Sequence, residues 1–206
     1  MSDEAPRGKR GWWVVTGVVW LGGIVAGSLA MARYSLTPGE SLAAPARWPG
    51  DSTVPRVEGR PTLVMLAHPL CPCTRASMGE LSLVMAKAQG RLDAFVLFLK
   101  PEGTGKDWEQ GELWRSAAAI PGVTALRDEG GVQAERFGAV TSGQVLFYDA
   151  GGALRFSGGI TTARGHAGDN AGRAAVEALL GDAPAEALAG HAVYGCELED
   201  PRGSAP

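Results

Sequence analysis

The sequence lacks the excess of basic residues that a nucleic-acid-binding protein needs. Its 206 residues contain 19 Lys and Arg against 22 Asp and Glu, which gives a formal net charge of −3. Beyond residue 32 no basic stripe interrupts the mixed charges. Because nucleic acid is bound through a positively charged face, the composition argues against nucleic acid as a partner. Internal repeats and low-complexity blocks are also missing, and the composition is that of one globular domain with short appendages.

The sequence also lacks charged residues between residues 12 and 32. The stretch WWVVTGVVWLGGIVAGSLAMA contains no charged residue, and about 20 apolar residues suffice to span a bilayer as a helix. Basic residues in the short N-terminal segment 1–11 predict that this end stays in the cytoplasm. Ala30-Met31-Ala32 offers a signal-peptide cleavage site, but the apolar run exceeds the roughly 7–15 residues of such peptides. We therefore favour an uncleaved single-pass anchor in the cytoplasmic membrane, with a periplasmic or otherwise extracytoplasmic domain.

Residues 33–60 lack apolar periodicity and carry four prolines among alanine and serine. This composition predicts a Pro/Ala-rich, semi-extended linker. A folded domain is expected over residues 61–182, followed by a C-terminal extension over residues 183–206 that carries Cys196. The chain is thus expected to consist of an anchor, a tether, one domain and a tail.

Within the domain, two short apolar runs at residues 62–67 and 92–99 predict strands buried on both faces. Residues 74–89 carry the apolar stripe of a helix. Further helix and strand patterns alternate along the chain, and turn residues at 149–152 separate two strands in a hairpin. The sequence therefore predicts an α/β fold with a central mixed β-sheet and helices on both of its faces.

Cysteine is scarce, yet two of the three cysteines lie one residue apart, directly after the first apolar run. Pro72 suits the first position of a helix, which makes Cys71 the expected N-cap. A thiolate there faces free backbone N–H groups and the positive end of the helix dipole, so its pKa falls from about 8.5 toward or below neutrality. A bridge between Cys71 and Cys73 would be strained and therefore reactive. The pattern predicts redox chemistry, and a metal site is the rival interpretation.

Two segments resemble the thioredoxin superfamily, especially its membrane-anchored, exported thiol–disulfide branch. LVMLAHPLCPCTRASMGEL, residues 63–81, is similar without a gap to the L-V-x-F-W-A-x-W-C-P-P-C-R-A-E-M-P-E-L pattern of that branch. FGAVTSGQVLFYDAGGAL, residues 137–154, is similar to the Y-G-V-x-G-x-P-T-x-F-L-I-D-x-x-G segment. A smaller group of anchored thioredoxin-like proteins labelled RedB, which share the CPC motif, is the closest resemblance. It implies a thioredoxin-like fold over about residues 61–180.

The resemblance also implies roles for single residues. Cys71 takes the place of the attacking cysteine, Thr74 that of the resolving cysteine, and Cys73 stands one residue early. Gly143 stands where the family has a cis-proline that faces the active cysteine, and Leu70 where a tryptophan is usual. The residues expected to form the substrate-binding edge are Gly143, Ser142, Leu70 and His68, of which His68 is also a candidate base.

Three residues remote from the CPC motif complete the expected site. In thioredoxin-like folds the loop over residues 158–170 abuts the active cysteine, so Arg164 could stabilise a thiolate and His166 could carry a proton. The alternative is that both are solvated loop residues. Cys196 is a resolving thiol that folds back, an intermolecular link or a lone buried thiol, and we favour a redox role.

The leading hypothesis is a thiol–disulfide oxidoreductase that needs no cofactor and acts on a disulfide- or thiol-bearing exported protein. Cys71 would be the nucleophile, and Cys73 or Cys196 would resolve the mixed disulfide. The alternative is a copper-binding or copper-delivery module in which Cys71, Cys73 and His166 hold Cu(I). A third hypothesis is a peroxiredoxin-like peroxidase, with Cys71 attacking peroxide and Thr74 assisting.

Overall fold

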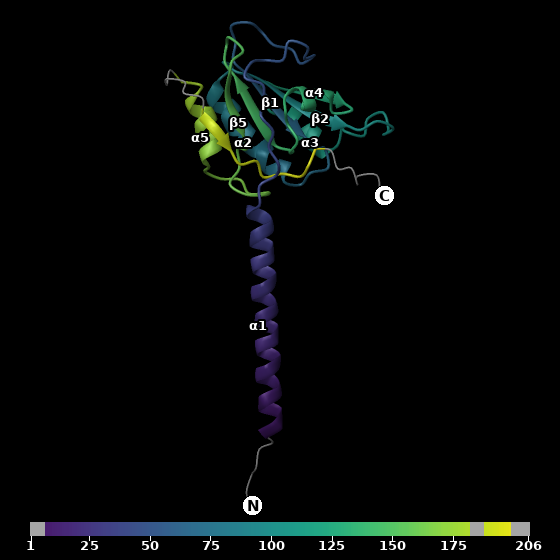
Figure 1. Cartoon of the computed structure of the whole chain (residues 1–206), viewed down its shortest axis with the longest axis vertical. Helices are drawn as coiled ribbons and strands as arrows, with labels where there is room; N and C mark the ends of the chain where they lie inside the picture. The colour runs from purple at the N-terminus through teal and green to yellow at the C-terminus, as the bar shows by residue number, and fades with distance from the viewer. Residues whose placement is uncertain (1–6, 182–187, 199–206) are drawn as a thin grey trace, which may run out of the picture. The chain divides into compact units, whose positions relative to one another are not determined.

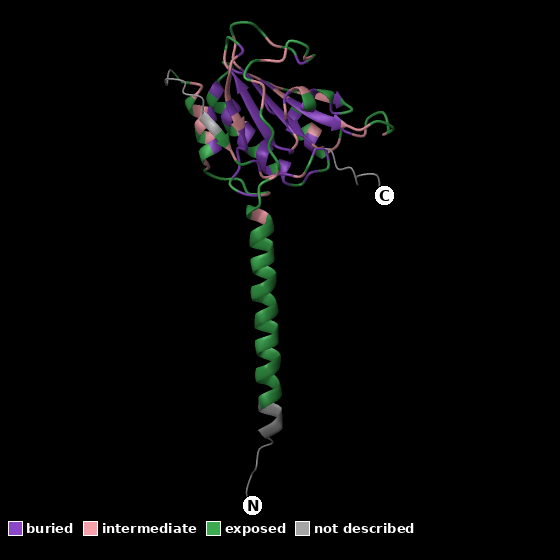
Figure 2. Ribbon diagram, viewed as in Figure 1, coloured by how far each residue is buried: buried purple, intermediate pink, exposed green. Residues whose placement is uncertain are grey.

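The computed structural model describes residues 7–181 and 188–198, and the chain divides into two units at residue 36. The first unit contains one helix, α1 (Arg7–Leu36). Its segment Gly11–Leu36 has a mean hydropathy of 1.9, and its most apolar window is wholly exposed, as Figure 2 shows in green. A helix of this length and composition fits a membrane anchor. The helix is longer than the predicted 21 residues, and its orientation across a membrane stays a prediction.

The second unit, residues 37–206, is built on a six-stranded mixed sheet with the order β3-β2-β1-β4-β5-β6 (Figure 1). Neighbouring strands are parallel in the pairs β1–β2, β2–β3 and β5–β6, whereas β4 is antiparallel to both β1 and β5. The strands are β1 (Thr62–Ala67), β2 (Asp93–Lys100), β3 (Val123–Glu129), β4 (Gln144–Tyr148), β5 (Leu154–Gly158) and β6 (Leu188–His191). The helices of this unit are α2 (Thr74–Ala88), α3 (Glu112–Ala118), α4 (Val132–Arg136) and α5 (Ala171–Ala178).

Helices cover both faces of the sheet, as the sequence predicts. Side chains of β1 alternate between two apolar clusters: Leu63 and Met65 enter one, and Val64 and Leu66 enter the other. The first cluster is completed by α2, α3 and α5, and the second by the short helix α4. All six residues of β1 are buried, as expected for a strand with two covered faces. The expected α/β architecture with flanking helices is confirmed.

Residues 37–60 differ from the expected free tether, because they pack on the second face of the sheet. The indole of Trp48 meets the rings of Phe137 and Tyr148 edge-on, each at a centroid distance of 5.2 Å. Val54 is buried in the same cluster. The five-residue helix α4 leaves much of this face bare, and the hydrophobic effect favours its coverage by the preceding chain.

The described part of the C-terminal extension also returns to the domain. Strand β6 adds to the sheet beside β5, after which Val193 and Leu198 are buried against the body of the unit. The Leu198 N–H donates to Val140 O at 2.8 Å, and the Gly39 N–H donates to Val193 O at 2.8 Å. We call residues 192–198 the tail. It is part of the fold, and its position determines the geometry of the site.

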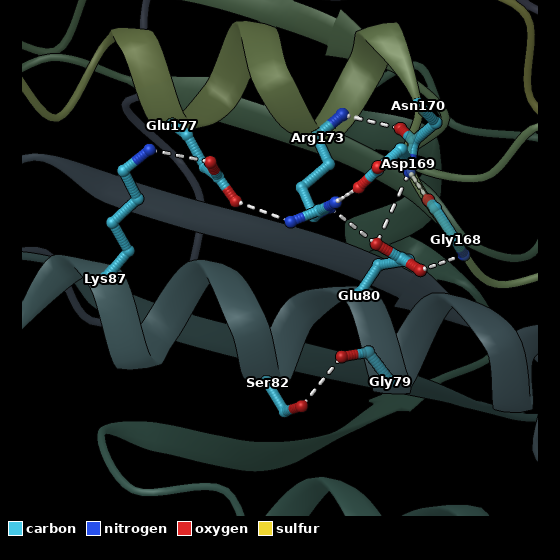
Figure 3. Close-up of polar contacts among 9 residues, drawn as sticks. All are labelled: Gly79, Glu80, Ser82, Lys87, Gly168, Asp169, Asn170, Arg173 and Glu177. Atoms are coloured by element: carbon cyan, nitrogen blue, oxygen red, sulfur yellow. Dashed lines mark hydrogen bonds and ion pairs between the residues drawn. The ribbon is translucent and has the colours of Figure 1, made fainter.

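A buried carboxylate fixes the loop over residues 158–170 to α2 (Figure 3). Glu80 is only 1% exposed and accepts a hydrogen bond from the Gly168 N–H at 2.6 Å. It also pairs with the guanidinium of Arg173 at 2.7 Å. Asn170 caps α5 by accepting the Arg173 N–H at 2.7 Å. A buried carboxylate with several partners is costly to disturb, so the loop that carries Arg164 is held at its C-terminal end.

Candidate functional site

Cys71 lies in a tight turn between β1 and α2. The Cys71 N–H donates to His68 O at 3.1 Å, and the Thr74 N–H donates back to Cys71 O at 3.2 Å. Helix α2 therefore begins at Thr74, as residues 74–89 predict, but its N-cap is Cys73, two residues after the expected Cys71. The reason is that the first bonds run from residue i+3 to residue i, as in the tight turns that often open a helix. The Cys71 sulfur still lies at the start of α2, where the Thr74 N–H is one of its donors.

The sulfur of Cys71 is surrounded by hydrogen-bond donors. The thiol of Cys196 is the most important, followed by the Thr74 hydroxyl and the backbone N–H groups of Cys196 and Thr74. These donors lower the pKa of Cys71 to about 4, against the opposing effect of burial. A carboxylate-like pKa means that Cys71 is a thiolate at neutral pH, the form that acts as a nucleophile. The direction is the one that the helix-start argument predicts, but the strongest donor comes from the tail.

The Thr74 hydroxyl belongs to a chain of directed hydrogen bonds. The His68 N–H donates to Ser142 Oγ at 2.8 Å, and Ser142 Oγ lies 2.7 Å from Thr74 Oγ1. Since Thr74 gives its proton to the Cys71 sulfur, Ser142 must donate to Thr74. Bonds aligned in this way polarise one another. Ser142 and His68, expected as substrate-binding residues, therefore act on Cys71 through Thr74.

The tail brings Cys196 to the same sulfur. The Sγ atoms of Cys71 and Cys196 are 3.0 Å apart, although 125 residues separate them in sequence. The Ser142 N–H donates to Cys196 O at 2.8 Å, and Thr141 and Glu197 form an antiparallel bridge. Gly195 permits this approach, because a Cβ at that position would lie 1.8 Å from Ser142 O. The pKa of Cys196 is raised, chiefly because its thiol donates to the Cys71 thiolate.

Cys73 is the third sulfur of the cluster. It is 7% exposed, and its Sγ lies with the other two in a group whose members are all within 4.8 Å. Burial raises the pKa of Cys73, and the negative charge of Cys71 raises it further. Cys73 is therefore held as a thiol beside the ionised Cys71.

Arg164 and His166 occupy different environments. Arg164 donates from Nη1 to Gly195 O and from Nε to Thr37 O at 3.2 Å. Its positive charge opposes the rise in the pKa of both Cys73 and Cys196. His166 is exposed, and its Nδ1 lies 2.8 Å from Arg164 O. Within the described part of the chain, the cluster with metal-ligand spacing contains the three cysteines and does not include His166.

The tail packs on one residue of the expected substrate-binding edge, Ser142, whose N–H donates to Cys196 O. Gly143 has a φ of 90°, which favours glycine, and a Cβ there would lie 2.8 Å from Ser77 Oγ. Among the described residues no peptide bond is cis. Leu70 is 65% exposed, and its N–H donates to His68 Nδ1 at 3.2 Å. Ser77 thus lies close to position 143, and the tail packs against the neighbouring Ser142. In the sequence, the glycine directly before Cys196 is the feature that could indicate a close approach of this segment to the domain.

Comparisons with known proteins support the fold. No family model matches the chain, and no curated protein matches it. A hypothetical protein from Sinorhizobium meliloti is similar in structure, with 18% identity, a TM-score of 0.56 and coverage of 80% of this chain and 94% of the other. An uncharacterised conserved protein from Geobacillus kaustophilus has the same identity and TM-score and is covered over 92% of its length.

An exposed lipoprotein thioredoxin from Streptococcus pneumoniae is also similar, with 15% identity, a TM-score of 0.44 and coverage of 60% and 84%. The fold is thioredoxin-like. The β1–α2–β2–α3–β3 parallel unit followed by the β4–β5 hairpin and α5 agrees with that class. The mixed sheet with flanking helices expected of a thioredoxin-like fold is confirmed by the topology, whereas the likeness to the RedB-labelled group stays a prediction.

The Thr74 hydroxyl gives the first testable prediction. In Thr74→Val the side chain keeps its shape but loses the donor to Cys71, and one hydrogen bond to a charged group is worth about 1.5–3 kcal/mol. The pKa of Cys71 should therefore rise by about one unit or more, as measured from the ultraviolet absorbance of the thiolate against pH. Thr74→Ser, which retains the hydroxyl, is the matched control and should titrate like the native protein. Equal pKa values in Thr74→Val and Thr74→Ser would contradict the assignment.

Proposed function

We propose that the chain is a thiol–disulfide oxidoreductase whose redox couple is Cys71 and Cys196. The observation that carries the proposal is the 3.0 Å contact between a thiolate sulfur and a thiol sulfur. A nucleophilic sulfur beside a second thiol is the arrangement that thiol–disulfide exchange requires. The thioredoxin-like fold is consistent with this role but does not by itself establish it.

The chemistry is a two-electron exchange. The reduced chain holds the Cys71 thiolate and the Cys196 thiol, and the oxidised chain holds a bond between the two sulfurs. Formation of that bond transfers two electrons to a partner disulfide, which becomes one thiol and one thiolate. The Cys196 proton goes to the thiol, and the thiolate takes up a proton from water according to its own pKa. The reverse reaction gives the disulfide to a dithiol partner. The partner is a disulfide- or thiol-bearing exported protein, and no further cofactor enters the balance.

Cys196 is better placed than Cys73 to pair with Cys71. A bridge between residues 71 and 73 would close a very small ring, whereas Cys196 approaches from an independent segment that can adjust by small rotations. A disulfide needs Cα atoms about 4.4–6.8 Å apart and a narrow range of dihedral angles. Cys73, held as a thiol by burial and by the Cys71 charge, is assigned a secondary role as a neighbouring thiol that can exchange with the pair.

Helix α1 would hold the domain at the cytoplasmic membrane, with the N-terminus inside and the domain on the periplasmic side. The basic residues before the apolar run support this orientation. The extracytoplasmic side is also the compartment in which disulfides persist. An anchored exchange domain would meet exported proteins as they leave the membrane.

Mapping of the disulfide tests the proposal. After mild oxidation of the full chain, non-reducing peptide mapping should find Cys71 linked to Cys196. Cys73→Ser should form the same link, whereas Cys196→Ser should lose it. Oxidised and reduced native protein should interconvert with a dithiol such as dithiothreitol. Failure of Cys73→Ser to form any disulfide, or an exclusive link between Cys71 and Cys73, would contradict the proposal.

A copper-binding module is the second candidate, and the three clustered sulfurs are the observation that favours it. Thiolates are the soft ligands that select Cu(I). Three ligands in a plane with metal–sulfur bonds of about 2.3 Å have sulfurs about 4 Å apart. The 3.0 Å separation of Cys71 and Cys196 is shorter than that, so the arrangement suits a dithiol better than a metal. A peroxidase role stays a prediction from the sequence.

The copper candidate predicts a ligand set that differs from the one expected from the sequence. If the reduced, anaerobic protein binds Cu(I), Cys196→Ser should weaken binding by at least about tenfold, because it removes a ligand. His166→Ala should bind as the native protein does, since His166 lies outside the sulfur cluster. Competition with a chromogenic Cu(I) chelator measures both affinities. If native protein takes no copper from the chelator, the candidate is rejected.

A further inference from the structure

We propose that partner proteins exchange at Cys196 and that Cys71 is the internal leaving group. This inference rests on the proposed redox couple and adds which of its two sulfurs meets the partner. In a thiol–disulfide exchange the attacking sulfur approaches one of the two bonded sulfurs, and access decides which one is attacked. The two sulfurs of this couple differ in access.

Cys71 is sealed inside the protein. It is 2% exposed, and Cys73 beside it is 7% exposed, whereas Cys196 is partly exposed. The tail passes directly over Cys71 and is held there from several sides. Ser142 N–H and Val140 O bond to the backbone of the tail, and Arg164 bonds to the carbonyl of Gly195. A partner sulfur can therefore reach Cys196 without displacing the tail, but it cannot reach Cys71 in that way.

The tail is a durable cover. Val193 and Leu198, on either side of Cys196, are each only 2% exposed. Lifting the tail would expose both side chains to water, which the hydrophobic effect opposes. It would also break the antiparallel bridge between Thr141 and Glu197. Attack at Cys196 requires none of these changes.

The donors around Cys71 remain in place when the disulfide opens at Cys196. The hydroxyl and the N–H of Thr74 and the N–H of Cys196 are hydrogen-bonded to the Cys71 sulfur, and none of them depends on the Cys196 thiol. They stabilise the negative charge that appears on Cys71 as it leaves. Among the leading effects on the Cys196 sulfur, the one that stabilises its anion is the charge of Arg164. Thiols with stabilised anions leave faster. The stabilised anion of Cys71 and the better access to Cys196 therefore both favour Cys71 as the leaving group.

The steps balance with a dithiol partner as the reductant. One partner thiolate attacks the Cys196 sulfur, a bond forms between the two, the Cys71–Cys196 bond breaks and its electron pair stays on Cys71 as a thiolate. The second partner thiolate then attacks the partner sulfur in the mixed disulfide. The partner gains its disulfide, and the Cys196 thiolate that leaves takes up a proton released when the partner thiols ionised. The chain in this direction donates a disulfide to a reduced exported protein with two cysteines.

The test compares the two sulfurs one at a time in the full chain. Cys71→Ser/Cys73→Ser leaves only Cys196, and Cys73→Ser/Cys196→Ser leaves only Cys71. Each is treated with dithiodipyridine, a disulfide whose released thiopyridone is followed by absorbance, across pH until the rate reaches its plateau for the full thiolate. We expect the plateau rate constant of Cys196 to exceed that of Cys71 by at least about tenfold. In urea the two rates should converge, which shows that the fold causes the difference.

A second measurement does not depend on the double variants. Oxidised Cys73→Ser protein is mixed with reduced glutathione, quenched with acid and mapped by mass spectrometry. Glutathione should be attached to Cys196. If glutathione is found on Cys71, or if Cys71 reacts as fast as Cys196 in the folded variants, the inference is overturned although the redox couple stands. If oxidation of Cys73→Ser gives no Cys71–Cys196 disulfide at all, the proposed function itself fails.

Discussion

The hydrogen bond between the thiol of Cys196 and the thiolate of Cys71 is the interaction on which the site depends. It is the leading cause of the low pKa of Cys71 and of the raised pKa of Cys196. One proton is shared by two sulfurs, so the pair titrates as a unit. The separation of 3.0 Å between the sulfurs exists only because the tail returns to the start of α2.

Ser142 links the hydrogen bonds at the start of α2 to the tail. Its hydroxyl connects the His68 N–H to Thr74, and its backbone N–H holds the carbonyl of Cys196. Gly143 follows it with a φ of 90°, and its N–H bonds to Leu66 O at 2.7 Å. A proline at position 143 could not supply that N–H. Glycine in place of the expected proline therefore fastens this loop to β1, while Gly195 lets the tail pack against it.

The sequence predicts the local parts of the structure well. Strand β1 follows from a continuous apolar run and helix α2 from an apolar stripe of period 3.6, and both lie close to their expected bounds. The direction of the pKa shift of Cys71 also follows from a local argument, its place just before a helix start, although the largest cause is the Cys196 thiol. The contacts of Trp48 and Cys196 do not, because neither segment has a periodic pattern. Their positions depend on which surface of the finished sheet is left uncovered, and only the assembled fold specifies that.

The pH dependence of the stability of the reduced protein tests the central claim most directly. The pKa of Cys71 is about 4 when folded and about 8.5 when unfolded, so between these values the unfolded state alone binds the proton. Stability from this group is therefore present above pH 8.5 and is lost as pH falls toward 4. Between pH 5 and 8 Cys196 is a thiol in both the folded and the unfolded protein, so it does not change the pH dependence of the unfolding free energy. The account predicts that, between pH 5 and 8, the urea-unfolding free energy of the native protein rises by about 1.4 kcal/mol per pH unit more than that of Cys71→Ser. Parallel curves for the two proteins would contradict it.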